Sequence, residues 1–329
     1  MESIRTKRFS LRNKMVLIMI PVIIICNLVT YLLTINMTSQ LMRKTAETNM
    51  KEMSDSVKYQ ISAELRETLG IMKNVKASVE RNCSGKEEIK KYIYDIADAY
   101  TDIIPSGIYC GLTDGTYIDK MWTPDDDWVM TERPWYKEGL ESDEVTLGET
   151  YMDANTGTYI VSAFANIKDT ANNVIGVICA DVELNKINEI ITGKNLFKKG
   201  YVYAVDKVTG MVFSNREETE KNGQILSDLD DAVSRNVDSM IQNAKFGEVA
   251  LADRTYLLTE EIPGSNFIAV CVAEQSDVQS DVKGIRMATA IAALAGCLVV
   301  CLVIYLALTF FLRPVQSILA GIEQMYHMD

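Results

Sequence analysis

Two long apolar segments without a charged residue constrain this chain more than any other feature. Residues 15–35 and 287–312 contain no Asp, Glu, Lys or Arg. An α-helix rises about 1.5 Å per residue, so each segment can cross about 30 Å of hydrocarbon. Both are apolar on all sides, which favours membrane-spanning helices over amphipathic surface helices. The alternative is a buried core helix. A cleaved signal peptide is disfavoured for the first segment, because its apolar run exceeds the roughly 7–15 residues of such a signal.

The charged residues outside these segments orient the chain. Five basic residues and one acidic residue precede residue 15, which predicts a cytoplasmic N-terminus and a two-pass protein in the cell membrane. One basic and two acidic residues follow residue 312, so 27 of the 33 basic and 42 of the 45 acidic residues lie between the segments. This external region therefore carries a net charge of −15, and an acidic chain of this kind is not expected to bind nucleic acid.

Residues 37–84 are predicted to form one long helix that continues the first crossing. Apolar side chains recur there at steps of three and four residues, at Val57, Ile61, Leu65, Leu69, Met72, Val75 and Val79. This stripe can pack on its own domain or on the same helix of a second copy. A homodimer built along the helix is the predicted assembly.

Between this helix and the second crossing, the pattern changes to short strands and turns. Residues 85–192 predict an antiparallel sheet of about five strands flanked by helices, with strands at 104–111, 116–122, 148–153, 158–167 and 174–182. Residues 193–275 repeat this order in a shorter form, with strands at 201–205, 211–213, 247–260 and 266–273 and a helix at 228–243. The fold class is therefore α+β, with a long N-terminal helix, two stacked modules of antiparallel sheet and helices, which the family resemblance given below makes PAS-like, and two flanking transmembrane helices.

A long polar insertion between the second and third strands carries candidate ligand-binding residues. It runs from Thr123 to Tyr136 and includes Trp128, Arg133 and Trp135. Loops of this length inside compact domains are usually functional. Arginine offers a planar fork that matches a carboxylate, and aromatic rings can wall a small pocket.

Three further candidates lie downstream of the insertion. Tyr151 and Asp153 share one face of a predicted strand, and Asp181 ends a run of apolar strand residues. A carboxylate in such surroundings needs a cation, and the ammonium group of a ligand would serve. The alternative is structural: Arg133 pairs with Asp153 or Asp181, and the aromatic residues belong to the core.

Together, the layout and these motifs resemble the bacterial double-Cache sensor receptors. One subset of that family senses amino acids and carries a Tyr, then Arg-x-Trp-Tyr five residues on, then Tyr-x-Asp and a distant Asp. Arg133-Pro134-Trp135-Tyr136, Tyr151-Met152-Asp153 and Asp181 match this pattern. Trp128 stands where the family has tyrosine, a departure that bears on the size of the pocket and on one hydrogen bond.

The resemblance implies a receptor for L-amino acids, most simply a methyl-accepting chemotaxis receptor, with its ligand in the membrane-distal module. In it, Arg133 and Trp135, helped by Tyr136, would hold the α-carboxylate, Tyr151, Asp153 and Asp181 would hold the α-ammonium, and Trp128 would wall the pocket. The alternatives are another small ligand (an amine, a purine or an organic acid) and the sensor of a histidine kinase or diguanylate cyclase. A dicarboxylate is disfavoured, because it would bring like charge to the acids.

The predicted organisation along the chain has eight segments. They are a cytoplasmic N-terminus (1–14), a first transmembrane helix (15–36), a stalk helix (37–84), a membrane-distal module (85–192), a membrane-proximal module (193–275), a connecting helix (276–286), a second transmembrane helix (287–312) and a signalling helix (313–329). Arg313-Pro314 resembles the start of a HAMP helix, so the cytoplasmic output domain is expected to be absent from this sequence.

No enzyme, cofactor or metal motif is apparent in the sequence. His327 is the only histidine and falls in the predicted cytoplasmic tail, so no external catalytic triad or metal site can use histidine. Walker and HExxH sequences are missing as well. We therefore predict a non-enzymatic sensor without a cofactor.

Overall fold

The computed structural model describes residues 11–326, which form two compact units. One unit is Ala46–Val278, and the other combines the helical segments before residue 46 and after residue 278. Most of the predicted cytoplasmic N-terminus, the end of the predicted signalling helix and His327 lie outside the described residues.

Two helices carry the apolar segments. Helix α1 (Leu11–Asn82) contains the first and continues without interruption into the predicted stalk, and α7 (Ser280–Tyr326) contains the second. Among the described residues these are the two helices long and apolar enough to span a membrane. Their most apolar windows have no buried residue, which does not fit the core helix of a soluble protein.

The first module, residues 85–192, is built on a five-stranded antiparallel sheet in the order β2-β1-β5-β4-β3, as predicted. Its elements are α2 (Lys86–Ala97), β1 (Ile108–Leu112), β2 (Tyr117–Ile118), the 3₁₀ helix η1 (Met130–Glu132), α3 (Pro134–Glu141), β3 (Thr146–Met152), β4 (Tyr159–Lys168), β5 (Val174–Glu183) and α4 (Leu184–Thr192). The insertion continues into helix α3, a helix that was not predicted from the sequence. Pro134 occupies the first turn of α3, where its missing N–H costs nothing.

The second module, residues 193–275, repeats this topology with the sheet order β7-β6-β10-β9-β8. Its elements are β6 (Tyr201–Asp206), β7 (Val212–Phe213), the 3₁₀ helices η2 (Thr219–Lys221) and η3 (Leu226–Asp228), α5 (Ala232–Gln242), β8 (Val249–Ala252), β9 (Thr255–Glu261) and β10 (Phe267–Glu274). The single strand predicted at 247–260 is two strands, because Asp253 and Arg254 adopt φ angles of 46° and 64° and turn the chain. The predicted connecting helix is also divided, into α6 (Gln275–Val278) and the start of α7.

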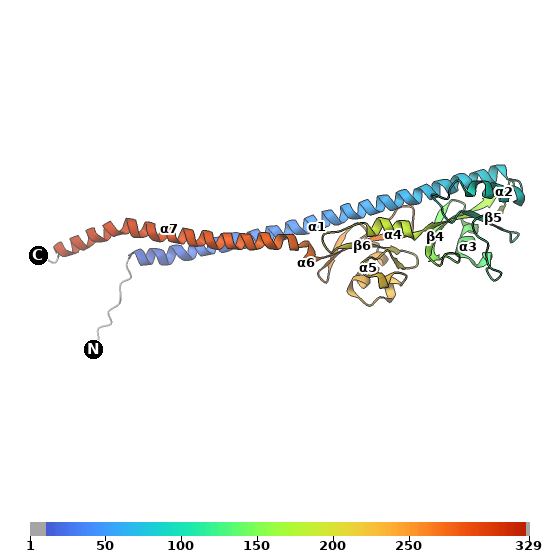
Figure 1. The fold of residues 1–329 in the computed structure, drawn as a ribbon. Helices are drawn as coiled ribbons and strands as arrows, with labels where there is room; N and C mark the ends of the chain where they lie inside the picture. Colours follow the sequence, from blue (N-terminus) through green and yellow to red (C-terminus); the bar gives the residue numbers. More distant parts are fainter. Residues whose placement is uncertain (1–10, 327–329) are drawn as a thin grey trace. The chain divides into compact units, whose positions relative to one another are not determined.

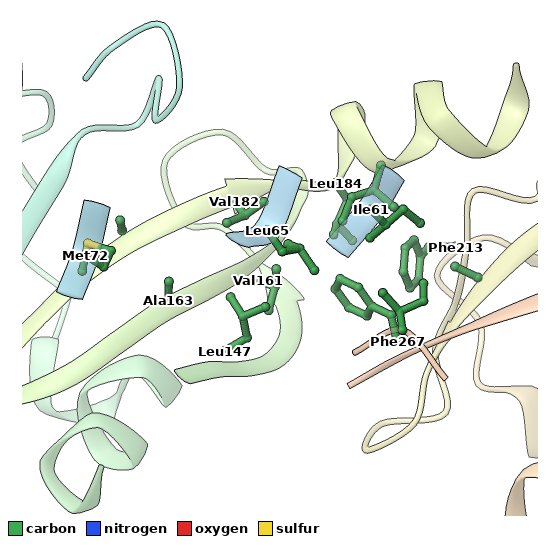
Figure 2. Packing of buried hydrophobic residues seen from close by; sticks show 14 of the residues in the cluster. Ile61, Leu65, Met72, Leu147, Val161, Ala163, Val182, Leu184, Phe213 and Phe267 are labelled. Atoms are coloured by element: carbon green, nitrogen blue, oxygen red, sulfur yellow. The ribbon is translucent and has the colours of Figure 1, made fainter. Parts of the chain in front are cut away.

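The apolar stripe of α1 packs on its own two modules, whose ribbons lie beside it in Figure 1. Leu65 lies beside Val161 and Val182 of the first module, and Ile61 lies beside Leu184 (Figure 2). All stripe residues predicted above are buried except Leu69, which is partly buried. Of the two interpretations of the stripe, packing within the domain is therefore correct, and a homodimer would have to use another face of α1.

A buried carboxylate joins the two modules. Asp206, at the end of β6, is fully buried, and its Oδ2 accepts a hydrogen bond of 2.7 Å from the backbone N–H of Thr150 on β3. Its Oδ1 accepts the N–H groups of Val208 and Thr209. The pairing of β3 with β4 shifts register between Leu147 and Thr150, so the Thr150 N–H is bonded to the second module instead of to the sheet.

Truncating the α1 stripe is expected to destabilise the first module. Leu65→Ala removes a side chain that is 1% exposed and should lower the free energy of unfolding by about 2–5 kcal/mol. Tyr59→Ala, on the same helix but 68% exposed, is the control and should change stability little. All three tryptophans lie in the first module, so denaturant unfolding followed by tryptophan fluorescence measures both. Equal stability of the two variants would contradict the packing described here.

Candidate functional site

A narrow cavity lies in the first module between the sheet and the insertion. Its volume is about 30 Å³, which is room for about two water molecules. Six of the seven predicted site residues line it: Trp128, Arg133, Trp135, Tyr151, Asp153 and Asp181. The structure thus brings together residues from the insertion, β3 and β5.

Close packing of the insertion on β1 holds these residues in place. A Cβ atom at Gly111 would lie 2.5 Å from Met130 Sδ and 2.9 Å from Trp135 Cη2, so glycine permits the approach. Trp135 is only 2% exposed, and its ring meets Tyr109 edge-on at 5.1 Å between centroids. One wall of the cavity is therefore part of a packed aromatic cluster.

Hydroxyl groups surround the carboxylate of Asp181 on β5. Its Oδ1 accepts hydrogen bonds from Tyr109 Oη at 3.0 Å and from Ser162 Oγ at 2.6 Å. Tyr151 Oη lies 2.6 Å from Ser162 Oγ and extends the network to β3. No described basic side chain forms an ion pair with Asp181. The partners of its side chain are therefore neutral hydroxyl groups.

Burial is the main cause that raises the pKa of Asp181, to about 7. The hydrogen bonds from Ser162 and Tyr109 act in the opposite direction, and the nearby carboxylates of Asp153 and Asp119 raise the pKa further. A cation placed beside Asp181 would relieve both the loss of hydration and the repulsion.

Arg133 occupies the N-cap position of α3 without a side-chain capping bond, and it is half-buried at the cavity. Its guanidinium carbon lies 5.8 Å from the centre of the Tyr151 ring. It forms no ion pair with Asp153, Asp181 or any other described acid. Asp153 Oδ2 instead accepts the N–H and hydroxyl of Thr156, each at 2.8 Å. The structural ion pair considered above is therefore not formed, and the guanidinium is available to a ligand.

Tyr136 is the predicted site residue that the structure separates from the others. It packs edge-on against Trp135, 5.6 Å between ring centroids, and its hydroxyl donates to the carbonyl of Leu112 at 3.3 Å. It does not line the cavity. Tyr136 therefore packs on Trp135 outside the cavity lining, and this position does not fit direct contact with a ligand carboxylate.

Several residues that line the cavity were not predicted from the sequence. They are Ser106, Tyr109, Tyr117, Asp119 and Trp122, together with Ser162 behind Asp181. Tyr109 faces Asp181 because Tyr109 pairs with Cys179, two residues before Asp181 on β5. Strand alternation could have assigned Tyr109 to this face only if the register between β1 and β5 had been known.

The segment between β7 and β8 of the second module forms ion pairs within the module. Lys221 Nζ lies 2.8 Å from Glu218 Oε1 and 2.9 Å from Asp231 Oδ2, and its side chain is 11% exposed. Tyr201, on β6, donates its hydroxyl to Glu218 at 2.9 Å. Glu218 and Asp231 are therefore satisfied by partners within this module.

Comparison with known proteins identifies the family. A family model for the Cache domain matches residues 38–282, about three quarters of the chain. The chain belongs to the Cache domain family. This match confirms the double-Cache resemblance noted in the sequence, and the two similar sheets are the two modules of such a domain.

Two curated relatives match the Cache domain in sequence. The methyl-accepting chemotaxis protein McpG of Pseudomonas putida is 25% identical over 226 residues, which cover 66% of this chain and 34% of the relative. The methyl-accepting chemotaxis protein McpB of Bacillus subtilis is 23% identical over 223 residues, which cover 65% and 33%. The chain thus matches about a third of the length of these relatives.

Solved ligand-binding domains share the fold. The domain of Mlp24, solved with asparagine, has a TM-score of 0.60 at 20% identity and covers 74% of this chain and 98% of its own. The domain of the Pseudomonas fluorescens chemoreceptor CtaA, solved with L-serine, has a TM-score of 0.57 at 17% identity and covers 71% and 99%. The sensory domain of Campylobacter jejuni Tlp3, solved with isoleucine, has a TM-score of 0.59 at 14% identity and covers 74% and 98%.

Replacing Asp181 by asparagine is expected to change how stability depends on pH. The pKa of this carboxyl rises from an ordinary value of 3.8 to about 7 in the fold, so the folded state binds the proton more tightly. Its contribution to stability is complete below about pH 4 and is lost as the pH rises through 7. Asp181→Asn should therefore be more stable than the parent at pH 8, by up to a few kcal/mol, with a difference that shrinks toward pH 5.

Thermal unfolding without ligand between pH 5 and 9 measures this effect. Asp102→Asn, at an exposed position of the same module, is the control and should follow the parent. A pH curve for Asp181→Asn that runs parallel to that of the parent would contradict the assignment.

Proposed function

We propose that this chain is the sensory region of a two-pass membrane chemoreceptor that binds an L-amino acid in its first module. The observation that carries the proposal is an unpaired arginine and a buried, unpaired carboxylate on one small cavity. Arg133 has no acidic partner there, and Asp181 has no basic one. A zwitterion supplies both missing charges at once.

The two ends of the ligand follow from these charges. The α-carboxylate would meet the Arg133 guanidinium and Trp135, and the α-ammonium would meet Asp181, Tyr151 and Asp153. Trp128 would remain a wall of the pocket. An amine without a carboxylate would leave Arg133 unpaired, and a dicarboxylate would face Asp181 with like charge. The amino acids present in the solved relatives, asparagine, serine and isoleucine, fit this pattern.

The sensor would lie outside the cell membrane between the two crossings. In this arrangement residues 85–192 are the membrane-distal module, 193–275 the membrane-proximal module and 276–286 the connection to the second crossing. The chemotaxis relatives and the two apolar helices support this topology. A HAMP helix from residue 313 would carry the signal to a cytoplasmic output domain, and we expect the receptor to act as a homodimer.

Signalling would be a shift between two populations of the sensor. Ligand binding would move the insertion and β3 relative to Asp181, and β3 is bonded through Thr150 to Asp206 of the second module. The movement then reaches α6 and the second crossing as a helix shift of about 1–2 Å, a displacement typical of conformational switches.

Calorimetric titration of the full chain in lipid nanodiscs with the twenty amino acids tests the proposal. At least one is expected to bind, and Arg133→Ala should weaken that binding about 100-fold, since a charge-assisted pair in a nearly dry site is lost. Arg235→Ala is the matched control, because Arg235 pairs with Asp230 on the exposed face of the second module. It should bind like the parent.

The outcomes separate the candidate functions. No binding by any amino acid, or equal binding by the parent and Arg133→Ala, would overturn the proposal. A ligand whose affinity survives the loss of Arg133 would indicate a receptor for amines or purines in the same cavity.

A further inference from the structure

The cavity carries more negative charge than a neutral amino acid can compensate. Asp119, Asp153 and Asp181 all line it, whereas Arg133 is its one basic lining residue. A zwitterion adds one charge of each sign, so two negative charges would stay uncompensated at the cavity. Such an excess is costly, and a ligand with an additional cation reduces it.

Asp119 belongs to a region of the cavity that the two ends of the ligand leave unused. The α-carboxylate is assigned to Arg133 and Trp135, and the α-ammonium to the network around Asp181. Of the remaining lining residues, Tyr117, Asp119, Trp122 and Trp128 come from one segment, residues 117–128, and form an aromatic and acidic wall; Ser106, Ala154 and Asn155 complete the lining. The third substituent of the α-carbon, the ligand side chain, must face this wall.

The chemistry of this wall is that of a cation site. The ring of Trp128 lies 4.8 Å from Tyr117 and 5.4 Å from Trp122, measured between centroids. Asp119 is fixed among these rings: its Oδ1 accepts the Met121 N–H at 2.7 Å, and its Oδ2 accepts the Tyr117 hydroxyl at 2.8 Å. A carboxylate flanked by aromatic rings attracts a cation through charge and through the ring faces.

We propose that Tyr117, Asp119, Trp122 and Trp128 form a subsite for the ligand side chain that selects cationic amino acids, such as lysine, ornithine and arginine. This inference rests on the proposed function and adds the ligand class to it. The pKa of Asp119 is raised by burial despite its hydrogen bonds, and Asp119 in turn raises the pKa of Asp181, which agrees with an excess of negative charge.

A long side chain would have to part the rings of this wall, and the local structure allows that movement. Residues 119–129 form neither helix nor strand, so the rings can part without breaking a sheet. Trp122 and Trp128 are partly exposed, and Met121 and Val129 beside them are 44% and 45% exposed. A side chain that passes between the rings therefore reaches the surface, where its charge keeps some water.

A comparison of lysine with norleucine tests the subsite, because norleucine has the same carbon chain and lacks the ε-ammonium. The full chain in nanodiscs is titrated with each at pH 8, where Asp181 is ionised. We expect lysine to bind at least about tenfold more tightly. Asp119→Asn should remove most of this preference by weakening lysine alone. Asp114→Asn, an exposed turn aspartate outside the cavity, is the matched control and should keep the preference.

The outcomes are distinct from those of the general proposal. Binding of norleucine as tight as that of lysine to the parent would overturn the subsite, even if Arg133→Ala abolishes both. A ratio of lysine affinity to norleucine affinity that is the same in Asp119→Asn as in the parent would overturn the subsite as well. If Asp119→Asn does not fold, as judged by tryptophan fluorescence, the test uses the ratio of lysine affinity to norleucine affinity in the parent and in Asp114→Asn. Equal affinities for the two ligands would then overturn the subsite. Absence of binding by every amino acid would instead reject the general proposal.

Discussion

Burial of one helical stripe holds residues 46–278 together. The side chains that recur along α1 at steps of three and four residues share one buried core with both modules, and each module has a second, separate cluster that does not involve α1. Leu65 packs on the first module, whereas Ile61 lies near Phe213 and Phe267 of the second (Figure 2). Because the same helix continues into the first apolar segment, its packing joins the ligand site to the chain segment that would enter the membrane.

The candidate site is less well satisfied than the core around it. Asp181 is 8% exposed and has hydroxyl partners but no cation, and Arg133 has no acid. A protein tolerates such a cost only when something else in the fold or in solution offsets it. Ligand that binds the folded state alone stabilises it by mass action, so the unsatisfied charges favour a folded state that is completed by ligand.

The sequence predicted the features of the molecule that depend on local pattern. Periodicity identified α1 and most strands, and residue chemistry identified six residues that line the cavity. The errors occur where tertiary structure decides. Helix α3 is only eight residues long and has no side-chain cap, so its pattern is too short to detect. The turn at Asp253-Arg254 has no glycine, and the separation of Tyr136 from the cavity depends on how α3 packs. Tyr109 and Ser162 could be recognised only from strand register.

The two modules solve the same electrostatic problem in different ways. In the second module, Glu218 and Asp231 share the ammonium of Lys221. Burial raises the pKa of Asp231, but the hydrogen bonds from Ser234 and Lys221 lower it by more. The pKa of Asp231 therefore falls to about 2. In the first, Asp181 has no such lysine, and its pKa rises to about 7. A covalently attached cation makes a module permanently satisfied and rigid. A module without one can gain free energy from a cation that a ligand supplies, and under the proposed function this gain would couple binding to a change in conformation.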